Sequence, residues 1–379
     1  MRHRMDKTRQ SLLLGAATAM LLFAPLTLGA DVDENAVSKV AAQHVEMSFS
    51  HSQEGWRKTG ISLRSGQSAT IIGDGAVNLG LPVPAPASLF LWARIGEDGD
   101  VFNVASDTYT FVAQTEGDLY LAVRPAGFYW TDRRGTFPAD FGGVPKYPLD
   151  AQAAVYRWSK APGAALTAMA ATDDARWQLA LSRYRDAPQL PDEFEYLWYL
   201  GQSTVFEAYE DGANFGVRAT PSNDGGIIRK ALDIPLNEET LFSFDWLYEQ
   251  LPAKGPETEA QYHDYLSIAL EFDNGQDLTW FWSGHLEAGT EFTCPLPWWD
   301  QRETHIAVQS GEEGLGDWHS HSRSVLQDYQ SAVGGELPGR IVGVWVINSG
   351  VFGDKPGEAV FANLKVRNGS AVTEVFNHK

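Results

Sequence analysis

Five residues of the C-terminal half could carry out acid–base chemistry on a polysaccharide. A glycosidase needs two carboxylates that face one cleft, and Asp245 with Asp264 could supply them. A lyase would instead use His319 or Tyr329 as the base, beside Arg323 to neutralise a uronate. No spacing compels either scheme, because convergence of distant residues is not encoded in their separation along the chain. The sequence has neither a Gly-x-Ser-x-Gly nor a His-Glu-x-x-His motif, so enzymatic activity has no positive support.

Two histidines two positions apart raise the question of a metal. On a strand, His319 and His321 would share a face and could bind an ion together with Asp317 or Asp264. At the start of a helix they would point apart. Asp317 followed by Trp318 is typical of a helix entry, so the sequence predicts a helix from residue 320 to about residue 333.

A structural role is the alternative for this segment, and we favour it. In that interpretation Arg323 and Asp328 form an ion pair, while Trp318 and Tyr329 pack the predicted helix onto a sheet. The single cysteine, Cys294, cannot form a disulfide within the chain.

Aromatic residues in two places could bind sugar rings. Trp280 and Trp282 alternate along a predicted strand and therefore point to the same face, either as an exposed pair that grips a glycan or as part of a core. In the N-terminal half, a loop combines Phe128, Tyr129 and Trp130 with charged neighbours. The predicted ligand-binding residues are Tyr129, Trp130, Asp132, Arg133, Trp280 and Trp282.

Composition limits the partners. The chain of 379 residues has a formal net charge of −20 and a pI near 4.8. Such a surface repels nucleic acid and anionic membranes, and no basic patch offsets it, so nucleic-acid binding is not expected. Hydrophobic residues make up 44% and aromatic residues 12%, which is enough to fill two cores.

The first 30 residues have the order of a secretory signal peptide. A basic stretch precedes an apolar run over residues 11–28, which ends in Gly29 and Ala30 before acidic residues. The alternative is an uncleaved N-terminal anchor. We find no second apolar span, so the mature chain is expected to lack an integral membrane segment and to be secreted or periplasmic.

The region from residue 45 to residue 158 has the pattern of an all-β domain. Strand-length runs at 68–72, 88–95, 108–113 and 119–123 are separated by Gly- and Asp-rich turns. This spacing predicts a β-sandwich.

Within that region, several motifs resemble the galactophilic lectin family of the PA-I type. They are Trp56, residues 59–63 with Gly66, residues 93–96, 111–113, 117–123 and 135–137. The resemblance covers about a quarter of the chain and implies a lectin fold in which calcium and galactose share a loop. Only Asp132 falls where a calcium ligand would be expected, and the cationic Arg133 beside it opposes calcium. Sugar binding through the aromatic residues does not require the ion.

Residues 159–190 are predicted to form a helical connector. Asp173 or Asp174 could cap a helix over residues 175–184, in which Trp177, Leu181 and Tyr184 fall at helical spacing. Two prolines near residue 190 then mark the domain change.

The pattern of residues 191–379 again predicts β-strands. Eight runs predict a jelly-roll-like sandwich: 215–219, 226–234, 240–246, 265–272, 278–282, 304–308, 341–347 and 359–366. Their order resembles a bacterial domain family of unknown function, numbered 3047. The matching motifs are residues 241–246, 263–265, 278–282, 317–318, 323–325, 328–329, 343–345 and 361–364. Asn348–Gly350 stands where that family has an acidic run.

The sequence as a whole therefore predicts an all-β protein with two sandwich domains joined by a short helical connector. The favoured function is binding of a glycan or polysaccharide, with calcium as the one cofactor considered. Two alternatives remain: a secreted hydrolase or lyase carrying a lectin-like domain, and an envelope adhesion or structural protein, which would expose a broad apolar patch.

Overall fold

The computed structural model describes most of the chain after the predicted signal peptide. The described residues are 33–51, 54–77, 85–104, 107–124, 130, 132–136, 148–187, 189–200, 202–203, 205–220, 225–263, 265–296, 299–349 and 356–376. The chain forms two compact units. Within the described residues, the first unit comprises parts of Met20–Ala187 and Trp198–Gln202, and the second comprises parts of Pro188–Leu197 and Ser203–Lys379.

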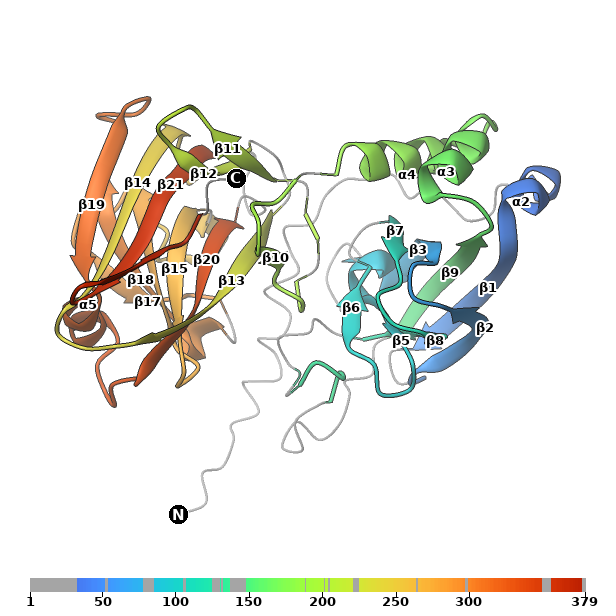
Figure 1. Cartoon of the computed structure of the whole chain (residues 1–379), viewed down its shortest axis with the longest axis horizontal. Helices are drawn as coiled ribbons and strands as arrows, with labels where there is room; N and C mark the ends of the chain where they lie inside the picture. The colour runs from blue at the N-terminus through green and yellow to red at the C-terminus, as the bar shows by residue number, and fades with distance from the viewer. Residues whose placement is uncertain are drawn as a thin grey trace, which may run out of the picture. The chain divides into compact units, whose positions relative to one another are not determined.

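The first unit is a β-sandwich of two antiparallel sheets (Figure 1). One sheet has the strand order β1-β9-β3-β4, with β7 also paired to β3, and the other has the order β2-β8-β5-β6. The strands are β1 (Ala41–His51), β2 (Arg57–Leu63), β3 (Ser68–Val77), β4 (Ala85–Pro86), β5 (Leu91–Ile95), β6 (Val101–Asn103), β7 (Thr108–Val112), β8 (Gly117–Val123) and β9 (Pro148–Trp158). Alternating residues of both sheets, such as Ile71 and Leu121, form the core between them.

Helices cover the outward face of the sheet that contains β3 and β9. The helices are α2 (Glu34–Val40), α3 (Pro162–Ala170) and α4 (Ala175–Arg185), with a short 3-10 turn, η2 (Ala87–Phe90), before β5. Asp174 caps α4 by accepting a hydrogen bond from the backbone N–H of Arg176, as the sequence predicts. Trp177 is fully buried against Tyr156 and Trp158, whereas Tyr184 is exposed. The predicted connector is thus packed into the first unit.

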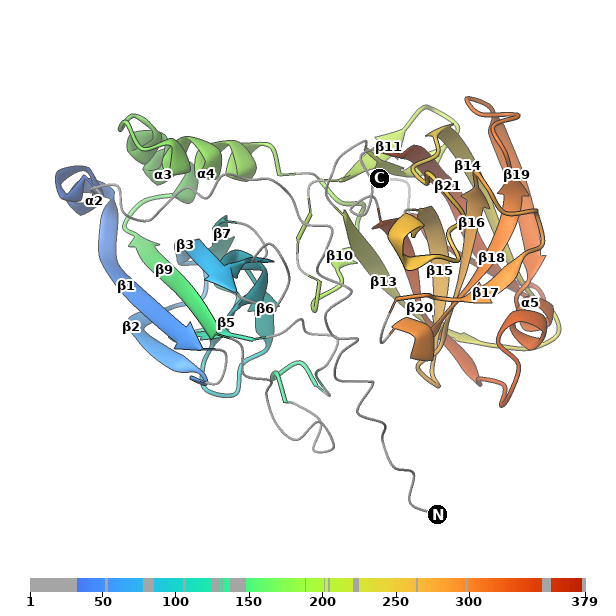
Figure 2. The ribbon, with the colours of Figure 1, turned by 180° about the vertical axis from the view of Figure 1, so that it is seen from behind.

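The second unit is a larger sandwich, and each of the eight strands predicted for it is present (Figure 2). One sheet has the order β10-β13-β20-β15-β16-β18-β17, and the other has the order β11-β12-β21-β14-β19, with β22 paired to β21. The strands are β10 (Glu195–Tyr196), β11 (Phe206–Glu210), β12 (Phe215–Ala219), β13 (Gly225–Pro235), β14 (Thr240–Gln250), β15 (Leu266–Phe272), β16 (Asp277–Ser283), β17 (Glu291–Thr293), β18 (Glu303–Ser310), β19 (Trp318–Ser324), β20 (Arg340–Ser349), β21 (Glu358–Asn368) and β22 (Ala371–Glu374).

The helix predicted from residue 320 is shorter and begins later. Residues 318–324 form strand β19, paired with β14, and α5 occupies only Val325–Ala332. Pairing with β14 overrides the local helix-entry signal at Asp317. Two further short turns lie in this unit, η5 (Ala260–Tyr262) and η6 (Trp299–Gln301). Across the part of the chain that the structure describes, no helix is long and apolar enough to cross a membrane.

Candidate functional site

The described candidates for catalysis do not share one face of the sheet. Asp245 lies on the face of β14 that points away from the core, where it accepts a hydrogen bond from Asn363 (2.7 Å). His319 pairs in register with Trp246 and so lies on the opposite face of the same sheet. Asp264 lies outside the described residues. The enzyme alternative required all five residues to meet in one cleft, and Asp245 and His319 do not.

The two histidines of β19 share a face, as the strand alternative predicted, and Gln309 lies between them. His319 donates from Nε2 to the Gly314 carbonyl (2.9 Å), and its Nδ1 accepts from the Gln309 side chain (3.2 Å). His321 donates from Nε2 to the Gln309 side-chain oxygen (2.9 Å). Both nitrogens of His319 are engaged, so it has no lone pair free for a metal in this arrangement.

Arg323 and Tyr329 hold α5 on the sandwich. Arg323 and Asp328 form a two-pronged ion pair, with N–O distances of 2.8 and 2.7 Å, and the buried Trp280 indole also donates to Asp328 (2.8 Å). Tyr329 is fully buried and accepts a hydrogen bond from Asn274 (2.8 Å). The ion pair and the packing of Tyr329 are those of the structural alternative that the sequence favoured. Trp318 departs from it, because it lies on β19 and contacts Tyr209.

Trp280 and Trp282 belong to the core of the second unit. Their exposed fractions are 0% and 1%, and they face the inner side of β16 with Leu278. Trp282 donates to the Gly311 carbonyl (2.7 Å). Of the two alternatives for this pair, the structure shows core packing, so the expectation of an exposed glycan-binding pair is wrong.

The described part of the lectin-like loop is compact. Trp130 is 7% exposed and packs on Trp92, with ring centroids 4.4 Å apart. Asp132 Oδ1 accepts hydrogen bonds from the backbone N–H groups of Arg134 (2.9 Å) and Thr136 (3.2 Å), which closes a turn.

Two further residues complete that loop. Gly135 has φ +79°, and a Cβ there would lie 2.9 Å from the Trp130 ring, so the turn requires glycine. Arg133 lies over the Trp198 ring, 5.8 Å from its centroid. Tyr129 lies outside the described residues.

An aromatic and cationic surface, which the sequence did not predict, lies on the outward face of the four-stranded sheet. Tyr120 and Arg94 pair in register on β8 and β5, opposite in orientation to core residues such as Leu121. The Arg94 guanidinium lies 4.5 Å from the Trp56 ring centroid and 5.4 Å from that of Tyr120. All three side chains are half-buried. We call Trp56, Arg94 and Tyr120 the open face.

Arg94 lies between two aromatic rings without a carboxylate of the described residues in ion-pair contact. Among the residues that the structure describes, it makes no ion pair, and its Nε has no hydrogen-bond partner. Burial lowers the pKa of Arg94, although an arginine stays charged at neutral pH. The Trp56 ring in turn rests against Trp130, with centroids 6.4 Å apart. The open face therefore adjoins the loop that the sequence singled out.

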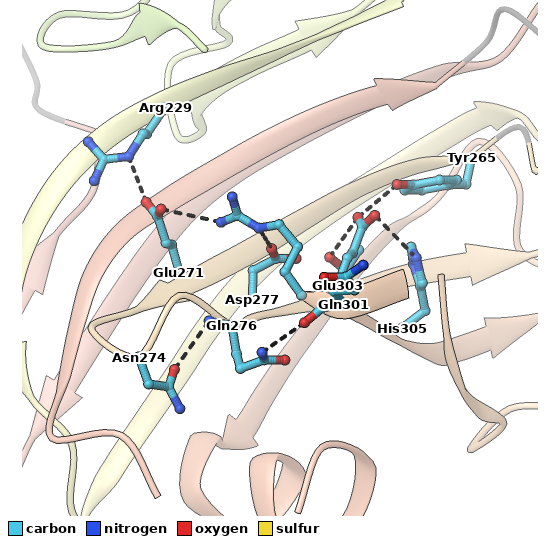
Figure 3. A network of polar contacts seen from close by, with 11 residues as sticks. Arg229, Tyr265, Glu271, Asn274, Gln276, Asp277, Gln301, Glu303 and His305 are labelled. Carbon is cyan, nitrogen blue, oxygen red and sulfur yellow. Dashed lines mark hydrogen bonds and ion pairs between the residues drawn. The ribbon is translucent and has the colours of Figure 1, made fainter. Parts of the chain in front are cut away.

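The second unit carries a polar layer on the outward face of its seven-stranded sheet (Figure 3). Arg229 donates to Glu271 (2.7 Å), and Arg302 links Glu271 (3.4 Å) to Asp277 (2.9 Å). The Arg302 guanidinium also lies 4.9 Å from the Trp345 ring centroid. We call the face with these residues and with Thr279, Glu303 and His305 the covered face.

The segments that precede β15 and β18 close off most of the covered face from solvent, while Arg229, Glu271 and Arg302 stay half-buried. Asp277, His305 and Trp345 are 0% exposed and Glu303 is 2% exposed. Burial, together with the charge of Glu303, raises the pKa of Asp277 well above its usual range. Asp277 and Glu303 are register neighbours on β16 and β18, but no substrate could reach them in this arrangement.

Four potential metal ligands meet at one end of the covered face. His263, Cys294, Glu303 and His305 are buried, and one ligand atom of each lies within 4.8 Å of all the others. No other such group of three or more occurs in the described residues, so neither Asp132 nor the β19 histidines belong to one. The sequence offered one signal for this cluster, the spacing of Glu303 and His305 on a strand.

The second unit carries the family similarity. Residues 197–365 match the model of a family described as a protein of unknown function, DUF3047, as its motifs predicted. No curated protein matches the chain.

Solved structures with some similarity are sugar-binding or sugar-cleaving domains by their titles. The xyloglucanase domain of NopAA from Sinorhizobium fredii, in complex with cellobiose, is 10% identical over 45% of this chain and 87% of its own, with a TM-score of 0.28. The family 11 carbohydrate-binding module from Clostridium thermocellum is 14% identical over 47% and 96%, with a TM-score of 0.20. The tandem CBM22 domains of Paenibacillus barcinonensis Xyn10C are 13% identical over 87% and 98%, with a TM-score of 0.24.

Proposed function

We propose that this chain is an exported carbohydrate-binding protein and that the open face of its first unit contacts the sugar. The observation that carries the proposal is the half-buried Arg94 guanidinium between the rings of Trp56 and Tyr120. Pyranose rings stack their C–H faces on aromatic rings, and an arginine without a carboxylate partner keeps its donors for hydroxyl groups.

Neighbouring residues extend this surface. Lys58 and Asp118 form an ion pair beside Tyr120, with N–O 2.5 Å, on the same sheet. Asp132 and Arg133 lie in the loop that covers Trp92, so they could add polar contacts at the edge of the surface. The PA-I type resemblance of this half supports the same kind of ligand. Sugar binding at the open face does not require calcium. If a chelator weakens binding of the sugar, Asp132 is the residue that we expect to hold calcium.

A glycan array with the purified full chain tests the proposal. We expect Trp56→Ala and Arg94→Ala each to weaken binding of the bound glycan at least tenfold, about 1.4 kcal/mol. Tyr184→Ala is the matched control, because Tyr184 is an exposed aromatic residue on α4, outside the open face. Absence of any glycan ligand, or equal binding by all three variants, would overturn the proposal.

The same samples address calcium, catalysis and export. Binding measured with calcium and with chelator decides whether Asp132 is a ligand, and assays for reducing ends and unsaturated products detect the alternative enzyme. Mass spectrometry of the secreted or periplasmic chain checks cleavage after residue 30. A mass that includes residues 1–30 would contradict the signal peptide.

A further inference from the structure

We propose that His263, Cys294, Glu303 and His305 form a structural zinc site in the second unit. This inference is independent of the sugar-binding proposal, which concerns the other unit. Thiolate and imidazole ligands favour zinc among the common divalent ions, and a structural site uses four protein ligands.

The two ligand–ligand distances in the cluster fit the spacing around a bound zinc ion. Zinc bonds of about 2.0–2.3 Å in a tetrahedron place the ligand atoms about 3.3–3.8 Å apart. His263 Nε2 lies 3.3 Å from Cys294 Sγ, and His305 Nε2 lies 3.6 Å from Glu303 Oε2. The second distance is too long for a hydrogen bond. The widest separation in the cluster is within 4.8 Å, so a small inward movement completes the tetrahedron.

His305 gives an independent indication of a ligand. Its side chain is 0% exposed, yet neither ring nitrogen has a hydrogen-bond partner. A buried imidazole without hydrogen bonds is costly. An ion between His305 Nε2 and Glu303 Oε2 would satisfy one nitrogen.

The surrounding residues orient the ligands. His263 donates from Nδ1 to the Glu257 carbonyl (2.7 Å), which leaves the Nε2 lone pair directed at the cluster. Tyr265 donates to Glu303 Oε1 (2.8 Å), which leaves Oε2 for the ion. Such outer hydrogen bonds are the usual partners of metal-bound histidine and carboxylate. Phe292 stacks on His305, with centroids 4.8 Å apart, and excludes water.

Charge balance also favours a divalent ion. A thiolate on Cys294 and a carboxylate on Glu303 together carry −2, which one Zn²⁺ neutralises in a buried site. Burial of the Glu303 carboxylate without a cation would be costly. The alternative of a Cys–His nucleophile is disfavoured, because burial and the Glu303 charge raise the pKa of the Cys294 thiol, and no solvent reaches the sulfur.

The ion would tie two separate segments to strand β18 of the sheet. His263 follows η5 in the segment between β14 and β15, Cys294 follows β17, and Glu303 and His305 lie on β18. These segments cover the polar layer. Zinc would therefore hold the covered face closed.

Metal analysis of the full chain, purified without a metal-affinity tag, tests the site. We expect about one zinc ion per chain after dialysis, and a fall in the unfolding temperature of the second unit of more than about 5 °C once a chelator removes it. Cobalt(II) in its place should give the visible absorption of tetrahedral coordination and a thiolate-to-cobalt charge-transfer band.

Variants locate the ion. Cys294→Ser should lose the charge-transfer band and His305→Gln should lose stoichiometric zinc. His285→Gln is the matched control, since His285 lies between β16 and β17, outside the cluster, and its ring bonds to the backbone carbonyl of Ala253. Unchanged zinc content in both cluster variants overturns the proposal. If those variants do not fold, the cobalt spectrum of the natural chain decides, and a folded chain without the charge-transfer band overturns the proposal.

Discussion

The two units each place an arginine against an indole ring on the outward face of a sheet, with opposite results. On the open face, Arg94 lies over Trp56, half-buried and without an ion pair among the described residues. On the covered face, Arg302 lies over Trp345, is also half-buried, and binds Glu271 and the fully buried Asp277. A cation over an aromatic ring therefore does not indicate a binding site by itself. The two arginines differ in their carboxylate partners.

The largest effect should follow removal of the cation from the covered face. Arg302→Met leaves the fully buried Asp277 without its ion-pair partner, while Glu271 keeps Arg229, so we expect a loss of about 3 kcal/mol in the free energy of unfolding. Urea unfolding of the natural chain, of Arg302→Met and of a control variant measures this loss. The control is Arg340→Met, whose ion pair with Asp233 is exposed and should contribute about 1 kcal/mol or less. Equal losses would mean that the covered face is no different from the surface.

Acid should affect the second unit through His321. Burial, with the charges of His319 and Arg323, lowers the pKa of His321 from 6.5 to about 4. Between these values the unfolded chain binds the proton and the folded chain does not, so stability is full above pH 6.5 and falls as the pH drops toward 4. Allowing for partial exposure, we expect a loss of roughly 1–2 kcal/mol.

Hydrogen exchange at pH 7 and pH 4.5 measures this loss unit by unit. His321→Gln should flatten the pH dependence of the second unit. A pH dependence of that unit that is as steep in the variant as in the natural chain would contradict the assignment.

The smallest effect is expected beside the open face. Asp132→Ala removes two hydrogen bonds from an exposed turn, which should cost about 1 kcal/mol. Thermal unfolding with and without calcium measures it. If calcium stabilises the natural chain and not the variant, Asp132 is a calcium ligand. If calcium changes the unfolding temperature of the natural chain and of Asp132→Ala equally, Asp132 is not a calcium ligand.

A strand could be predicted from the sequence where apolar and polar residues alternate along it. A strand without that alternation, whose conformation comes from pairing with an adjacent strand, could not. Residues 240–246 alternate between buried and half-buried positions in β14, and this period is visible in the residue types. Strand β19 reads Trp-His-Ser-His-Ser-Arg-Ser, without such alternation. Its conformation comes from pairing with β14.

The sites were less predictable than the strands, because they depend on register and on covering segments. Trp280 and Trp282 were correctly placed on one face, but only the packing of two sheets shows that this face is the inner one. His263 and Cys294 join Glu303 through segments far apart in the chain. The available signal was His305 on the predicted strand 304–308 with Glu303 directly before that strand, two positions away.

Strand β19 has a further consequence, for assembly between molecules. It is the last strand of its sheet, so its outer backbone groups are the place where another chain could add and start a fibre. The polar side chains of this strand disfavour pairing with a strand of another molecule. Helix α5 follows directly and keeps the strand short. Replacing Ser320 and Ser322 with valine should leave the monomer folded while making it prone to aggregate.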